Sequence, residues 1–122
     1  MELGRRMNRL RVDHEVDHDA VTVRAEGDVD ISSVHTLTEG LRAALESALE
    51  HPARLLVVDL DGVTYFGSAG LNALLDCHEH GVDAGVSVRL VASDLRVLRP
   101  LQVTNLDSVL AVYPTSAQAR KH

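Results

Sequence analysis

Two stretches near the start of the chain alternate apolar and polar residues. The apolar positions are Leu10, Val12 and Val16 in the first stretch and Val21, Val23 and Ala25 in the second. Because successive side chains of a strand point to opposite faces, this spacing predicts two half-buried strands. The Asp-rich residues 17–19 between them favour a turn. The chain is therefore expected to begin with a β-hairpin.

The pattern then changes to a helical period. Apolar residues recur at spacings of three and four, at Val34, Leu37, Leu41, Ala44, Leu45 and Ala48. Such a stripe predicts an amphipathic helix that ends before Pro52. Ser32 or Ser33 is expected to cap its start by accepting a hydrogen bond from a free backbone N–H.

A short continuous apolar run at residues 55–58 predicts a strand that is covered on both faces and lies in the middle of the sheet. We expect a connection over residues 63–67 and a second helix over residues 68–80. Gly81 can end this helix, because glycine readily adopts the left-handed conformation of a C-cap.

Shorter elements complete the chain. Alternation over residues 86–92 predicts a strand, and Asp94 is expected to cap a third helix that Pro100 shortens or bends. Residues 109–113 predict a last short strand, and residues 116–122 a terminal helix or tail. The order β-β-α-β-α-β-α-β indicates an α/β fold with a mainly parallel sheet and helices packed against it.

Composition and charge narrow the functional classes. The net charge of −6 disfavours nucleic acid as a ligand, and the basic cluster of Arg5, Arg6, Arg9 and Arg11 is interpreted as a solvated tail and strand edge. The single cysteine fits a reducing compartment, and no apolar run predicts a membrane span or signal peptide. We expect a cytoplasmic protein with an N-terminal tail at residues 1–8 and one domain at residues 9–122.

Two segments contain residues that bind metals in other proteins. Residues 14–18 match H-E-x-x-H, but the zinc-protease motif needs a helix, and here it falls on a predicted strand and turn. Residues 77–80 read Cys-His-Glu-His, of which a helix would place only Cys77 and His80 on neighbouring positions. Neither segment predicts a metal site, and no cofactor is expected.

Residues 66–70 place a hydroxyl where the connection from the central strand meets the second helix. Ser68 has the position of an ordinary helix cap. A serine-hydrolase interpretation would need G-x-S-x-G, but Phe66 stands where the first glycine should be, and the chain is short for that fold.

Four segments together resemble the STAS domain family of anti-sigma factor antagonists, over residues 12–113. Residues 27–30 resemble its Gly-Glu-Leu-Asp segment, and residues 56–66 its hydrophobic strand and Asp-Leu-x-x-Val turn. Residues 68–71 resemble the end of its Asp-Ser-Ser-Gly-Leu signature. Residues 88–98 with 104–107 resemble its later strand, helix and Thr-Gly-Leu ending.

The resemblance implies a STAS-type mixed sheet of four to five strands with an N-terminal hairpin and helices mostly on one face. It also implies a binding protein rather than an enzyme, a monomer or weak dimer, whose partner is an anti-sigma factor that is also a serine kinase. By position, Ser68 corresponds to the serine that the kinase phosphorylates. The expected partner-binding residues are Asp28, Asp30, Gly67, Ala69, Gly70 and Asn72.

The signature departs from the family at two positions. Gly67 stands where the family usually has Asp, and Ala69 where it often has a second hydroxyl residue. The missing carboxylate leaves an alternative open, a STAS scaffold or sensory module in a larger signalling or transport assembly that meets no kinase.

Overall fold

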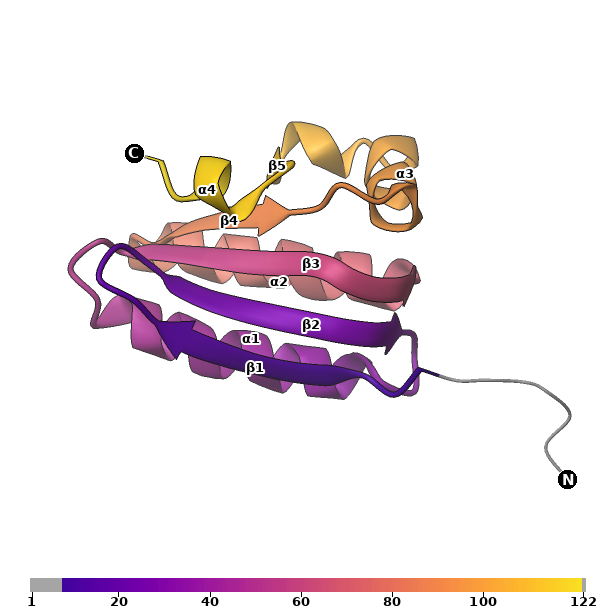
Figure 1. The fold of residues 1–122 in the computed structure, drawn as a ribbon, viewed down its shortest axis with the longest axis horizontal. Coiled ribbons are helices and arrows are strands. Elements are labelled where there is room, and N and C mark those ends of the chain that lie inside the picture. The colour runs from indigo at the N-terminus through magenta and orange to yellow at the C-terminus, as the bar shows by residue number, and fades with distance from the viewer. Residues whose placement is uncertain (1–7, 122) are drawn as a thin grey trace, which may run out of the picture.

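The computed structural model describes residues 8–121 (Figure 1), so residues 1–7 of the expected tail, with Arg5 and Arg6, and His122 lie outside the described residues. Asn8, at the end of that tail, donates from its side-chain amide to Thr64 Oγ1 at 3.2 Å. In chain order the elements are β1 Arg11–Val16, β2 Val21–Val29, α1 Val34–Leu49, β3 Leu55–Phe66, α2 Ser68–Ala84, β4 Ser87–Val91, α3 Leu95–Val103, the 3-10 turn η1 Leu106–Ser108, β5 Ala111–Tyr113 and α4 Ser116–Ala119.

The five strands form one mixed sheet in the order β1-β2-β3-β4-β5. β1 and β2 pair antiparallel as the expected hairpin, and every later pair is parallel. β3 lies in the middle, as the continuous apolar run predicted. The mixed, mainly parallel sheet inferred from the sequence is thus confirmed.

Helices cover both faces of the central strand. Figure 1 shows α1 and α2 side by side along one face, and there Leu56 and Val58 of β3 join the main core. Leu55 and Val57 point the other way and pack with Ala119 of α4. This double coverage explains why β3 reads as an unbroken apolar run instead of an alternating one.

Two boundaries differ from the sequence-based expectation. β3 continues through the predicted connection to Phe66, because residues 63–66 pair with the end of β2, a partner that lies more than 30 positions away in the chain. α2 continues past Gly81 to Ala84, and Gly85 is its left-handed C-cap with φ 78°. Gly81 instead lies against β4, where a Cβ atom would come within 2.7 Å of Val88 Cγ2.

The third helix begins as expected and ends later than its proline suggested. The Asp94 carboxylate accepts a hydrogen bond from the Arg96 backbone N–H at 2.8 Å, which confirms the predicted cap. The Arg96 side chain, first through its hydrogen bonds, lowers the pKa of Asp94. Pro100 lies inside α3, which continues to Val103. Over residues 8–121, no helix is both long and apolar enough to span a membrane.

Arg120 connects the C-terminal segment to the hairpin turn. Its guanidinium donates to Asp19 Oδ1 at 2.5 Å, to Asp17 Oδ2 at 2.8 Å and to Thr22 Oγ1 at 2.6 Å. Thr22 is buried, so Arg120 also satisfies a polar group that water cannot reach. This three-way contact holds α4 against the second face of the sheet.

Replacing Arg120 with Gln should lower the free energy of unfolding by about 1–2 kcal/mol. The change removes a charged donor from three acceptors and leaves two neighbouring carboxylates unneutralised. Urea unfolding measures the effect, with exposed Arg99→Gln as control, expected to change stability by less than about 0.5 kcal/mol. Equal unfolding midpoints for the two variants would show that Arg120 does not hold α4 in place.

Candidate functional site

The carboxyl ends of β2, β3 and β4 meet at one edge of the sheet, at the right of Figure 1, where α1, α2 and α3 begin. In open α/β sheets this edge is the usual place for binding. The segments that the sequence singled out converge on it: residues 28–30 end β2, and residues 67–72 begin α2.

Ser68 is the first residue of α2, and its side chain is exposed. Gly67 precedes it as N-cap in an extended conformation, φ −91° and ψ 179°. The Gly67 backbone N–H donates to Val29 O at 2.9 Å, which joins the end of β3 to the end of β2. Ser68 therefore lies at a fixed point on the surface where two central strands end.

The N-terminus of α2 has no side-chain cap, because Gly67 has no side chain to provide one. The N–H groups of Ser68 and Ala69, at the start of the helix, have no carbonyl one turn earlier to bond. They point out of the end of a 17-residue helix, where the helix dipole is positive. This end of α2 is suited to an anionic group.

Gly70 is buried, and its contacts explain why the signature needs glycine there. A Cβ atom at this position would lie 2.6 Å from Phe66 Cε1 and 2.8 Å from Val29 Cγ1, both buried side chains. Gly70 thus lets the first turn of α2 lie directly on the ends of β2 and β3. That Gly70 contacts a partner stays a prediction, because the contacts found for Gly70 are those with Phe66 and Val29 inside the domain.

Asn72 lies one turn after Ser68, so the two exposed side chains share a face of α2. Ala69 is partly exposed beside them. These positions form a small polar surface on the first turns of the helix.

Asp28 lies at the same edge of the sheet, but its side chain is on the face opposite α1 and α2. It precedes Val29, whose side chain is in the core under the helices, so the Asp28 side chain points to the opposite face. Thr64 Oγ1 donates to Asp28 Oδ1 at 2.6 Å, and the Asn8 backbone N–H donates to Oδ2 at 3.3 Å. Through these hydrogen bonds, Asp28 links β2 to β3 and to the segment before β1.

Asp30 organises the loop between β2 and α1. Its Oδ1 accepts from the Ser32 N–H at 2.9 Å, the Ser32 hydroxyl at 2.7 Å and the Ser33 N–H at 3.1 Å. The Ser32 hydroxyl is the largest cause of the lowered pKa of Asp30, which is ionised at neutral pH. The loop leaves Ile31 88% exposed.

The predicted cap of α1 by a serine is wrong. Ser33 is the N-cap residue but makes no side-chain cap bond. Its hydroxyl donates to the Asp28 carbonyl at 2.8 Å and accepts from the Asp30 N–H at 3.0 Å. The Asp30 carboxylate instead accepts from the N–H groups of Ser32 and Ser33, in the turn that precedes α1.

The sequence reasoning missed three exposed apolar side chains at this edge. Ile31 follows β2, Tyr65 is 55% exposed near the end of β3, and Leu95 is 58% exposed at the start of α3. The Tyr65 ring lies against Gly67, where a Cβ atom would come within 3.3 Å of its Cε2. An isoleucine between Asp and Ser, and one of only two tyrosines beside the signature, were the available signals.

The two histidine-containing motifs lie elsewhere. His14 is within β1 and His18 in the turn after it, so residues 14–18 form no helix, as the alternation predicted. Cys77 is buried in α2, and burial raises the pKa of its thiol to about 11. Among residues 8–121, no group of three or more His, Cys, Asp or Glu side chains could hold a metal ion.

A model of the STAS domain family matches residues 11–119. The chain is 31% identical over 113 residues to the anti-sigma-F factor antagonist RsfA of Mycobacterium tuberculosis, covering 92% of this chain and 86% of that protein.

Solved structures show the same fold. A crystal structure of an anti-sigma factor antagonist from Mycobacterium paratuberculosis superposes with a TM-score of 0.80 at 25% identity, covering 90% of each chain. SpoIIAA, an anti-sigma factor antagonist solved in its unphosphorylated form, gives 0.68 at 14% identity, covering 90% of this chain and 91% of that chain.

Replacing Gly70 with Ala should destabilise the domain by about 1–2 kcal/mol. The added methyl group overlaps Phe66 and Val29, which cannot move away, and this cost exceeds the gain in helix propensity. Thermal unfolding measures the change. Gly67→Ala is the comparison variant and should cost less, about 0.5 kcal/mol, because alanine is a poorer N-cap than glycine. Its new atom meets the exposed, movable ring of Tyr65 at 3.3 Å and the Val29 carbonyl oxygen at 3.5 Å. If both variants unfold alike, the close packing at Gly70 is not the reason for the glycine.

Proposed function

Because the chain belongs to the STAS domain family, we propose that it is an anti-sigma factor antagonist. It binds an anti-sigma factor that is also a serine kinase, frees the sigma factor held there, and is switched off by phosphorylation of Ser68. It acts by binding and catalyses no reaction, and its place of action is the cytoplasm. It works as a monomer or weak dimer.

The observation that carries the proposal is the exposed Ser68 hydroxyl at the uncapped start of α2. A kinase can reach this oxygen without unfolding the domain. A phosphoryl group there would add about −1.5 to −2 charges and three acceptor oxygens next to free backbone N–H groups. The fold should tolerate the modification, so its effect falls on the surface.

That surface has the composition of a docking site. Ile31, Tyr65 and Leu95 supply exposed apolar anchors around the edge that carries Ser68. Asp30 adds a negative charge at the same edge. A phosphoryl group on Ser68 would add to that charge, and like charges across an interface can cost several kcal/mol.

We assign the partner contacts to this edge. Asp30, Gly67, Ala69 and Asn72 would contact the kinase with Ser68, while Asp28 and Gly70 would act mainly by holding the edge in shape. SpoIIAA, a protein of the same fold, has been solved in both an unphosphorylated and a phosphorylated form. That pair supports the idea that this fold accepts the modification.

Gly67 keeps a second function open. The family usually has Asp there, and the missing carboxylate is compatible with a protein that meets no kinase. The same edge would then serve a STAS scaffold or sensory module in a larger signalling or transport assembly. Recovery of transporter or signalling-complex subunits, and no kinase, with the wild-type protein as bait would favour this function.

The proposal predicts opposite behaviour for two Ser68 variants. Ser68→Ala should hold the anti-sigma kinase recovered from a lysate of the source organism as tightly as unmodified protein does. Ser68→Asp should weaken binding by about tenfold or more, because it places a permanent negative charge at the docking edge. Calorimetry with the purified kinase measures both affinities, and mass spectrometry of Ser68 after incubation with ATP tests the modification.

Ser87→Asp is the matched control. Ser87 is exposed at the start of β4, at the opposite edge of the sheet, and its new charge should leave kinase binding unchanged. The Ser68→Asp variant should remain as stable as wild type or gain up to about 1 kcal/mol, because an acidic residue in the first helical turn is favourable. Full kinase binding by Ser68→Asp would contradict the proposed switch.

A further inference from the structure

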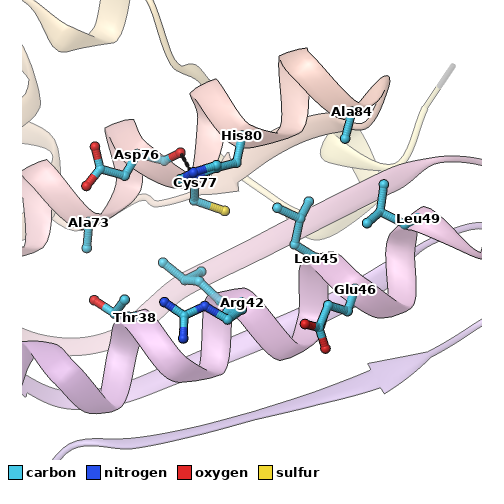
Figure 2. Close-up of a pocket in the computed structure, with 11 residues that line it drawn as sticks. Thr38, Arg42, Leu45, Glu46, Leu49, Ala73, Asp76, Cys77, His80 and Ala84 are labelled. Atoms are coloured by element: carbon cyan, nitrogen blue, oxygen red, sulfur yellow. Dashed lines mark hydrogen bonds between the residues drawn. The ribbon is translucent and has the colours of Figure 1, made fainter.

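A groove of about 400 Å³ lies between α1 and α2, away from Ser68 (Figure 2). It exists because large side chains on α1 face small ones on α2. Its apolar lining consists of Leu41, Leu45 and Leu49 from α1 and Ala73, Cys77 and Ala84 from α2. The volume is within the range of small-molecule sites, whereas a partner helix, about 10–12 Å across, would need a wider trough.

The groove is polar at one end and apolar at the other. Figure 2 shows Thr38, Arg42 and Asp76 at one end and Leu45, Leu49 and Ala84 together at the other. Between them lies the Cys77 thiol, which its raised pKa keeps uncharged at neutral pH. A ligand that follows this groove would need one polar end and an apolar body.

Within the described part of the chain, Arg42 is the one Arg or Lys side chain that lines the groove. The ion pairs found among residues 8–121 use Arg11, Arg24, Arg96 and Arg120, and Arg42 takes part in none of them. Glu46, one turn after Arg42 on α1, also lines the groove, and Figure 2 shows its carboxylate directed away from α2. The guanidinium is therefore available to a carboxylate, which it can bind with two parallel hydrogen bonds.

Two neighbours limit what Arg42 can accept. Asp76 on the facing helix also lines the groove and reduces the positive potential there, which favours a singly charged anion over a dianion. His80 Nδ1 is hydrogen-bonded to the Asp76 carbonyl of its own helix at 2.8 Å, the dashed line in Figure 2, so this nitrogen is not free for a ligand.

We propose that the α1–α2 groove binds a small amphipathic monoanion, namely a straight-chain carboxylate of medium length. Its carboxylate pairs with Arg42, and its chain lies over Leu45 and Leu49 toward Ala84. The site does not depend on the function proposed for Ser68, because no residue of the α2 signature lines it.

The test is calorimetric titration of the full-length protein with decanoate below its micelle-forming concentration. We expect saturable binding of one decanoate per chain. Arg42→Gln should weaken binding by about tenfold, because the ion pair with the decanoate carboxylate is lost. Leu49→Glu should weaken it by a similar factor, because it places a charged carboxylate against the apolar alkyl chain. Both positions are exposed, so both variants should fold.

Two variants on α3 serve as matched controls. Arg99→Gln and Val103→Glu make the corresponding changes at exposed positions outside the groove and should leave decanoate binding unchanged. The proposal is wrong if no saturable binding occurs, if all four variants bind alike, or if decanol or decyl phosphate binds as tightly as decanoate. It is also wrong if sedimentation shows that a second copy of the chain closes this face.

Discussion

The close packing of α2 on the ends of β2 and β3 is the constraint on which the site depends. Gly70 permits it by leaving room for Phe66 and Val29, and the Gly67 N–H bond to the Val29 carbonyl joins the two strand ends beneath it. The first turn of α2 therefore has one position relative to the sheet. Ser68 is exposed at the surface as a result, while Gly67 before it and Gly70 two residues after it are held against the ends of β2 and β3.

Most of the fold could be predicted, because its signals are local. Alternation gave the hairpin, the helical stripe gave α1, and an apolar run gave a central strand covered on both faces. The errors arose at positions whose structure depends on residues far away in the sequence. The extension of β3 to Phe66 needs the end of β2 as its pairing strand, and Gly81 is a place of close contact with Val88 rather than a helix end. Neither partner is adjacent in the sequence.

The candidate site was predicted less completely. The hydroxyl of Ser68 could be placed at the start of a helix from the sequence pattern, and its proposed role came from the family resemblance. The hydrogen bonds at the start of α1 could not be predicted, because Asp30, Ser32 and Ser33 all have suitable oxygens and only the loop geometry leaves the helix without a side-chain cap. The exposure of Ile31 and Tyr65 was equally hidden, since apolar residues are normally expected in the core.

The proposed switch requires that a charge added at Ser68 changes docking and leaves the fold intact. The most direct test compares unmodified protein with protein phosphorylated only at Ser68, by calorimetry against the anti-sigma kinase and by thermal unfolding. We expect the phosphorylated protein to bind the kinase about tenfold or more weakly and to unfold at a temperature equal to or slightly above that of unmodified protein. Equal affinity of the two forms, or a large loss of stability on phosphorylation, would contradict the proposed switch.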